Sequence, residues 1–207
     1  MIIVVNNDHG ASSPRWKRLR SFLRRELGAK NMCVVTKAEH VKGLAATQVR
    51  GIILSGGPLF LSKPLAFQDI AMNSLVMSMF PQVPVLGICF GCQYLHALHG
   101  TPLIHQSSRK RVKGRYQVTI DTTHPLFESM GGAESTMASF AFQDMIEVGG
   151  VDYSVWKPLA WLEEKNEYPC AWAHNQRPWY GVMFHPEDVK EHHGILRTFL
   201  SRVCGQA

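Results

Sequence analysis

Gly87-Ile88-Cys89-Phe90-Gly91 places one cysteine between two glycines, directly after the apolar run Val83–Ile88. A short buried strand that turns sharply into a helix is the layout of a nucleophile elbow, with the reactive side chain at the pivot. Small neighbours let the chain segments pass closely while the pivot adopts a strained backbone. A helix N-terminus also favours the thiolate. The pattern therefore predicts a nucleophilic Cys89, and the alternative is a structural cysteine in a glycine-flanked loop.

His185-Pro186-Glu187 is the segment that best supplies a base for such a nucleophile. A nucleophilic cysteine needs a base within hydrogen-bond reach, and the base needs an orienting group. His185 directly follows the apolar strand Tyr180–Phe184, and Pro186 fixes the turn after it. Glu187, two residues on, can face the same way and hold the imidazole tautomer. Taken alone, these three residues are more typical of an ordinary surface turn, but beside a cysteine elbow the functional interpretation is favoured.

Ser55-Gly56-Gly57-Pro58 follows the apolar run Gly51–Leu54. Glycines at the end of a strand leave backbone N–H groups open to a ligand. The N–H of Gly57, together with that of Phe90, is expected to form an oxyanion hole for acyl transfer. By itself the segment is only a turn signal.

The elements that must position these loops alternate along the first half of the chain. Strands are predicted at 2–5, 32–35, 51–54 and 83–88, and helices at 14–27, 41–46, 65–80 and 92–99. This alternation predicts an α/β fold with a mostly parallel, doubly wound sheet and flanking helices. Ligands of such sheets bind beyond the carboxyl ends of the strands, where the loops 6–10, 55–58 and 87–91 lie.

After Gly100 the pattern changes to short strand-like segments separated by turn residues. These segments are 101–104, 116–120, 136–140, 160–162, 170–173 and 179–184. They are typical of a small antiparallel addition to the sheet, and a closing helix is predicted over 189–203. With 207 residues and 45% hydrophobic content, the whole chain 1–207 is expected to be a single globular domain.

The number and spacing of the cysteines indicate the redox environment of the protein. The number is odd, at 5, and the spacing is irregular, so a disulfide framework is not expected. Cys89 and Cys92 form a C-x-x-C, which leaves a redox pair or half a zinc site as alternatives, but the chain has no second cysteine pair. No metal or cofactor is predicted. A reducing, cytoplasmic location is expected, and no apolar run has the length of a membrane span.

The net charge of +6 is concentrated in two basic runs, Arg15–Arg25 and Arg109–Arg115. Each is expected to be a solvated helix face or loop. The functional alternatives are an acidic partner surface, a phosphorylated ligand or nucleic acid. No nucleic-acid motif supports the last, so neither nucleic acid nor membrane is predicted as a partner.

Three stretches resemble the class I (triad) glutamine amidotransferase family in their sequences and in their order: GIILSGGP at 51–58, VPVLGICFGCQ at 83–93 and YGVMFHPE at 180–187. The resemblance covers essentially the whole chain. Within the family, the SGGP and YGVxFHPE forms look most like the amidotransferase part of GMP synthetase.

The resemblance implies a role for each matching residue. Cys89 attacks the side-chain amide of L-glutamine to give a γ-glutamyl thioester and ammonia, His185 moves the protons, and Glu187 orients His185. The N–H groups of Gly57 and Phe90 stabilise the oxyanion. Gly56 and Gln93 complete the substrate-binding residues that the motifs supply.

One segment departs from the family pattern. Where the relatives of GMP synthetase type carry Ser-His-Gly-Asp, this chain has ASFAFQD at 138–144. Either Ser139 or Ala141 matches the motif serine, and Phe140 or Phe142 then replaces the motif histidine, so all four are kept as candidate substrate-binding residues. The first strand is also followed by Asn-Asn-Asp-His-Gly, where the relatives have Asp-Phe-Gly-Ser-Gln. Both departures concern substrate binding and communication with a partner.

The leading hypothesis is a glutaminase subunit that supplies ammonia to a synthetase. The chain has no P-loop and no Ser-Gly-Gly-x-Asp-Ser stretch, so the synthetase is expected to be a separate partner chain or a domain outside this sequence. A free-standing γ-glutamyl peptidase or hydrolase is the first alternative. A non-catalytic glutamine-binding regulatory protein is the second, and the intact Cys, His and Glu residues argue against it.

Overall fold

The computed structural model describes residues 1–8, 13–64, 67–107, 111–165 and 168–205. Within these residues, one sheet contains nine strands in the order β2-β1-β3-β4-β11-β10-β9-β6-β7. The first five strands in that order pair in parallel. Their bounds are β1 Ile2–Val5, β2 Met32–Val35, β3 Gly51–Leu54, β4 Val85–Ile88 and β11 Trp179–Val182.

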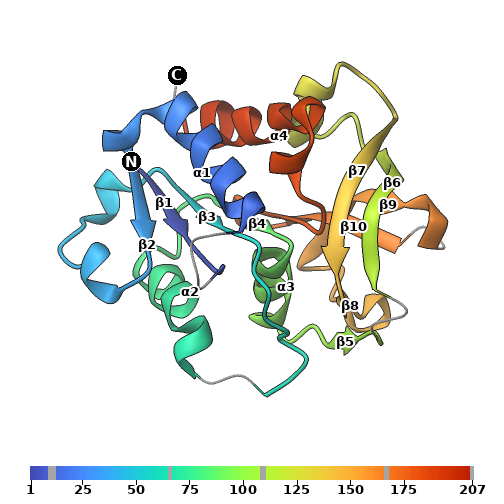
Figure 1. Cartoon of the computed structure of the whole chain (residues 1–207), viewed down its shortest axis with the longest axis horizontal. Helices are drawn as coiled ribbons and strands as arrows, with labels where there is room; N and C mark the ends of the chain where they lie inside the picture. Colours follow the sequence, from blue (N-terminus) through green and yellow to red (C-terminus); the bar gives the residue numbers. More distant parts are fainter. Residues whose placement is uncertain (9–12, 65–66, 108–110, 166–167, 206–207) are drawn as a thin grey trace.

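Helices cover both faces of the parallel strands. Helices α1 (Pro14–Leu27) and α4 (His193–Thr198) lie on one face, and α2 (Phe67–Met79) and α3 (Phe90–Ala97) lie on the other (Figure 1). Every residue of β1, β3 and β4 is therefore buried, which explains why the sequences of these strands are continuous apolar runs. The predicted doubly wound α/β arrangement is confirmed.

Helix α1 matches its predicted bounds because its signals are local. Ser13 caps the helix by accepting a hydrogen bond from the N–H of Trp16, and Pro14 occupies the first turn. The apolar residues Trp16, Leu19, Phe22 and Leu23 are buried at helical spacing. Gly28, with φ +74°, ends the helix.

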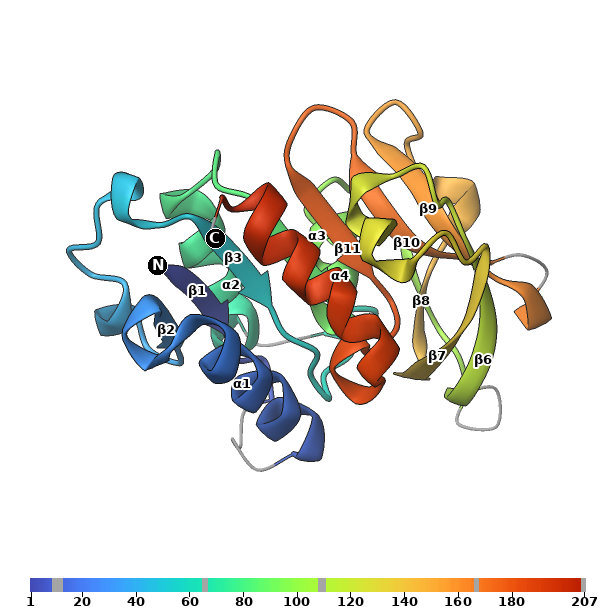
Figure 2. The ribbon, with the colours of Figure 1, turned by 90° about the horizontal axis from the view of Figure 1, so that it is seen from above.

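The second half of the chain extends the same sheet with antiparallel strands (Figure 2). These are β10 (Tyr168–His174), β9 (Trp156–Leu162), β6 (Val112–Ile120) and β7 (Ser135–Phe142). A separate two-stranded sheet joins β5 (Leu103–His105) to β8 (Asp144–Ile146). The antiparallel addition is confirmed, but β6 and β9 begin earlier than predicted and β8 was not predicted.

Three predicted helices differ from the structure. Helix α3 spans Phe90–Ala97, two residues earlier than the predicted 92–99. The segment 41–46 forms turns between short 3₁₀ segments at Ala38–His40 and Ala46–Gln48, because Gly43 adopts φ +84° and interrupts any helix. The closing helix begins at His193 instead of 189, after a 3₁₀ turn at Lys190–His192, and it ends in a π-helical turn at Phe199–Val203.

Strand β11 ends at Val182, two residues before the predicted end. Met183 and Phe184 leave the strand, which lets His185 reach the carboxyl edge of the sheet. Parts of three sequence predictions lie outside the described residues: the start of the predicted helix at 65–66, positions 9–10 of the first loop, and 109–110 of the second basic run.

All five cysteines are free thiols. Among the described residues, no group of three or more His, Cys, Asp or Glu side chains is arranged to hold a metal ion. In the same part of the chain, no helix has both the length and the apolar character that crossing a membrane requires.

Candidate active site

Cys89 stands at a strained pivot between β4 and α3. Its backbone has φ 51° and ψ −105°, and it is the only non-glycine residue with positive φ in the described chain. Both flanking glycines are needed: a Cβ on Gly87 would lie 2.6 Å from the carbonyl group of Gly91, and a Cβ on Gly91 would overlap the carbonyl oxygen of Leu54. The structure therefore contains the predicted elbow at Cys89. Backbone strain of this kind concentrates at functional sites.

His185 reaches the same edge from the end of β11. Its N–H donates to the carbonyl oxygen of Ser139 at 2.8 Å, and its carbonyl oxygen accepts from the N–H of Asp188 at 3.1 Å. Nδ1 of His185 lies 2.8 Å from Oε1 of Glu187, and the two side chains are only 4% and 2% exposed. The turn thus holds a buried imidazole against a buried carboxylate.

The electrostatics of this pair favour a charged imidazole. Burial lowers the pKa of His185, but the negative charges of Glu187 and Cys89, together with the hydrogen bond to Glu187, outweigh burial and raise the pKa to about 10. The raised pKa favours the imidazolium form of His185 beside Cys89. Nε2 of His185 has no hydrogen-bond partner among the described residues. This nitrogen can therefore bond to a molecule in the cavity.

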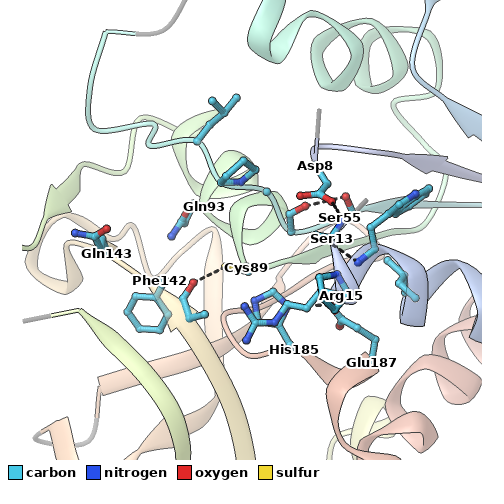
Figure 3. A pocket seen from close by; sticks show the side chains of 18 of the residues that line it. Asp8, Ser13, Arg15, Ser55, Cys89, Gln93, Phe142, Gln143, His185 and Glu187 are labelled. Carbon is cyan, nitrogen blue, oxygen red and sulfur yellow. Dashed lines mark hydrogen bonds and ion pairs between the residues drawn. The ribbon is translucent and has the colours of Figure 1, made fainter. Parts of the chain in front are cut away.

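Cys89, His185 and Glu187 line one cavity of about 440 Å³. Gln93 and Phe142 lie on one side of Cys89 in this cavity, and Asp8, Ser13 and Arg15 lie on the other (Figure 3). The backbone of the glycine loop closes over the cysteine: a Cβ on Gly56 would lie 2.9 Å from Cε1 of His185 and 3.6 Å from Cβ of Cys89. The cavity therefore places a cysteine and a histidine beside a space that can admit a small amide, which is an arrangement that supports acyl transfer.

The family model for glutamine amidotransferase class I matches residues 13–203. The chain belongs to the class I glutamine amidotransferase family. It is 28% identical to a subunit of the glutamine-hydrolysing GMP synthase of Methanococcus maripaludis over 99% of this chain and 97% of that one. It is 32% identical to the GMP synthase of Caldanaerobacter subterraneus over 75% of this chain, and that match spans 28% of the synthase.

Solved structures show the same fold. A candidate GMP synthase subunit from Thermoplasma acidophilum superposes with a TM-score of 0.71 at 23% identity, covering 99% of this chain and 93% of that one. A glutamine amidotransferase from Thermotoga maritima superposes with a TM-score of 0.70 at 13% identity, covering 99% and 98%. The predicted membership and fold are therefore confirmed.

The glycine loop is held by asparagines that the sequence motifs do not include. The N–H of Asn7 donates to Oγ of Ser55 at 2.9 Å, and its Nδ2 donates to the Ser55 carbonyl oxygen at 2.8 Å. Nδ2 of Asn73 donates to Oδ1 of Asn7 at 2.7 Å. A Cβ on Gly57 would overlap the carbonyl oxygen of Asn7, so Gly57 is required for close contact with this network. Isolated asparagines carry no pattern that sequence reasoning can use.

Gln93 lines the cavity and also fastens β8 to α3. Its Nε2 donates to the carbonyl oxygen of Asp144 at 2.7 Å. The buried carboxylate of Asp144 accepts from the N–H and Oγ of Ser62 at 2.9 and 2.6 Å and lies 2.8 Å from Nδ1 of His105. Sequence reasoning missed Asp144, Ser62 and His105, because the contacts join segments far apart in the chain.

The structure distinguishes the two ways in which segment 138–144 could match the Ser-His-Gly-Asp motif of the family. Ala141 and Phe142 line the cavity, and the Ala141 carbonyl oxygen lies 4.0 Å from Sγ of Cys89. Phe140 is instead fully buried, edge-on to Phe142 and Phe184, and is outside the cavity lining. The expectation that Phe140 contacts substrate is therefore corrected.

Ser139 is also outside the cavity lining, and its Oγ donates to Asp188 at 3.0 Å. The expectation that it contacts substrate is corrected in the same way. Phe90 has a buried side chain that does not line the cavity. Its N–H stands at the first residue of α3, where helical N–H groups have no intrahelical acceptor, and its predicted oxyanion contact stays a prediction.

Proposed function

We propose that this protein hydrolyses the side-chain amide of L-glutamine at Cys89 and delivers the ammonia to a synthetase of the GMP synthase type. The observation that carries the proposal is the strained elbow at Cys89 in one cavity with the buried His185–Glu187 pair. The family membership supplies the substrate class.

The proposed reaction uses the three residues in turn. The thiolate of Cys89 attacks the side-chain amide carbon of glutamine, and the carbonyl π electrons move to oxygen, where N–H groups of Gly57 and Phe90 stabilise the negative charge. The tetrahedral intermediate collapses, the C–N bond breaks, and the imidazolium of His185 gives its proton to the departing nitrogen, which leaves as ammonia.

The γ-glutamyl thioester that remains is cleaved by water. Neutral His185 takes a proton from the water as it attacks the thioester carbon, the C–S bond breaks, and glutamate leaves as Cys89 returns to the thiolate. Glu187 stabilises the imidazolium in both halves of the cycle through its contact with Nδ1.

The partner follows from the relatives. The Methanococcus protein of nearly equal length is named as one subunit of a synthase, and the longer synthases match this chain over 28% of their length. We infer that residues 1–207 form a single amidotransferase domain and that the acceptor chemistry belongs to a partner chain or to a further domain.

Glutamate release from glutamine, measured with and without a synthetase chain of the GMP type, tests the proposal. We expect slow basal hydrolysis that rises with the partner, complete loss in Cys89→Ala, and wild-type behaviour in Cys33→Ala, since Cys33 lies outside the cavity lining. The absence of hydrolysis under both conditions would contradict the proposal. A basal turnover of about 10 s⁻¹, an ordinary enzyme rate, that no partner changes would identify a free-standing γ-glutamyl hydrolase instead.

A further inference from the structure

Asp188 directly follows Glu187 and binds side chains from two distant elements. Oδ2 accepts from Nε of Arg15 at 2.8 Å and Oδ1 accepts from Nη2 of Arg18 at 2.7 Å, both from α1. Oδ2 also accepts from Oγ of Ser139 in β7 at 3.0 Å. We propose that these four residues, here called the Asp188 clamp, are positioning residues that set His185 relative to Cys89. This proposal rests on the proposed function.

Ser139 binds both ends of the turn that runs from His185 to Asp188. Its carbonyl oxygen accepts from the N–H of His185 where the turn begins, and its hydroxyl donates to Asp188 where the turn ends. The turn itself is closed by the N–H of Asp188 donating to the His185 carbonyl oxygen. Movement of Asp188 therefore moves the backbone that carries His185.

The arginines also decide which carboxylate faces the imidazolium. Glu187 and Asp188 are adjacent, and either can in principle pair with a positively charged ring. Burial raises the pKa of Asp188, but its hydrogen bonds to Arg15 and Arg18, with the charge of His185, outweigh burial and lower that pKa. Asp188 is thus an anion engaged by α1, and Glu187 is left as the partner of His185.

The clamp differs from an ordinary surface ion pair. The Asp188 side chain is only 10% exposed, and two guanidinium groups and one hydroxyl converge on it. Shared networks of this kind are worth more than isolated surface pairs, which contribute little. Arg15 and Arg18 also line the cavity, so part of the basic run expected to be a solvated helix face supports the site.

Asp188→Asn, Ser139→Ala and the double variant Arg15→Gln/Arg18→Gln test the clamp. Arg20→Gln is the matched control, because Arg20 is an exposed arginine of the same helix. The readouts are kcat and KM for glutamine, and the rate at pH 7 of Cys89 alkylation by iodoacetamide, located by peptide mapping. The alkylation rate reports the reactivity of Cys89 beside His185 in the absence of substrate. Circular dichroism detects any loss of fold.

For Asp188→Asn we expect kcat to fall about 10-fold, since a misplacement of about 1 Å at a catalytic group can cost about 10²-fold, while KM stays within about 2-fold. Cys89 alkylation is expected to slow by a similar factor. Adding Asp188→Asn to the double arginine variant should cost less than it does in the wild type, because all three residues act through one network. Arg20→Gln should match the wild type.

Two results would overturn the clamp: a folded Asp188→Asn with the kcat and alkylation rate of Arg20→Gln, or a raised KM with unchanged kcat, which would indicate substrate contact. If Asp188→Asn does not fold, Ser139→Ala removes one oxygen atom, and unchanged kcat and alkylation there would equally reject the clamp. A wild-type protein that neither hydrolyses glutamine nor shows faster alkylation at Cys89 than at Cys33 would contradict the proposed function itself.

Discussion

Two buried histidines lie near opposite ends of α3 in opposite electrostatic settings. His185 lies beside Cys89 at the N-terminus of the helix, and His96 belongs to its last turn. Both side chains are almost completely removed from solvent. The pKa of His185 is raised to about 10, whereas that of His96 is lowered to about 3.

The region around His96 is aromatic instead of charged. Its ring stacks on Trp156 with a centroid distance of 4.4 Å and meets the edge of Trp172 at 4.8 Å. Neither ring nitrogen of His96 has a hydrogen-bond partner among the described residues. Burial, followed by the charge of nearby His99, lowers the pKa. Burial and a neighbouring histidine therefore favour a neutral His96, whereas the acidic neighbours Glu187 and Cys89 favour a charged His185.

The sharpest test of this contrast replaces each histidine in turn. His185→Ala should lower kcat for glutamine hydrolysis at pH 7 by about 10²–10⁴-fold, which is the usual contribution of a general acid–base group. His96→Phe keeps the aromatic packing and should leave kcat within about 2-fold of the wild type, since His96 touches no reacting group. Equal losses in the two variants, with intact circular dichroism, would mean that the catalytic histidine is wrongly assigned.

His96 should instead determine acid stability. Because its folded pKa lies below the unfolded value near 6.5, the unfolded state takes up the proton first as the pH falls, and stability is lost between about pH 6.5 and 3. A shift of this size corresponds to up to about 5 kcal/mol. We expect denaturant unfolding of His96→Phe to depend less steeply on pH in this window than that of the wild type.

The control for that titration is unfolding at about pH 8, where position 96 is uncharged in both the folded and the unfolded state. Any packing cost of His96→Phe is measured there separately from the titration. Parallel curves for the wild type and His96→Phe would show that His96 is not held neutral by its surroundings.

Glu187→Gln should have an intermediate effect on catalysis. Loss of the carboxylate charge lowers the pKa of His185 toward its ordinary value, so the alkaline decline of kcat should move to lower pH. The loss of kcat at pH 7 should be about 10-fold, smaller than in His185→Ala, because the imidazole remains. A loss equal to that of His185→Ala, or an unchanged alkaline limb, would mean that Glu187 does more, or less, than orient and stabilise the ring.

The smallest effect is expected at Phe142, where the relatives of GMP synthetase type are expected to have histidine. Phe142 lines the cavity, so Phe142→His should change stimulation by a partner by roughly 2–3-fold, the size of one weak polar contact, with less change in basal turnover. Phe140→His is the contrast, since Phe140 is buried in the core. It should lower the melting temperature without altering stimulation, and the reverse pattern would reject the assignment of Phe142 to the departing motif.

The sequence was sufficient wherever the signal is local. The elbow at Cys89, the turn after β11 and the bounds of α1 depend on neighbouring residues, and all are found as predicted. Strand β8 and the Asp188 clamp depend on pairing between segments far apart in the chain, for which one sequence carries no register. Alternation along β7 likewise could not tell Phe140 from Phe142, because both are apolar and both are buried.

Covalent labelling with a glutamine analogue that carries an electrophile, followed by peptide mapping, tests whether Cys89 is the nucleophile. We expect one adduct, on the peptide that contains Cys89, which excess glutamine prevents and Cys89→Ala abolishes. Cys92 should stay unmodified, because it is fully buried and packs against Gly181. An adduct on Cys92 or Cys33 with Cys89 untouched would contradict the assignment of Cys89 as the nucleophile.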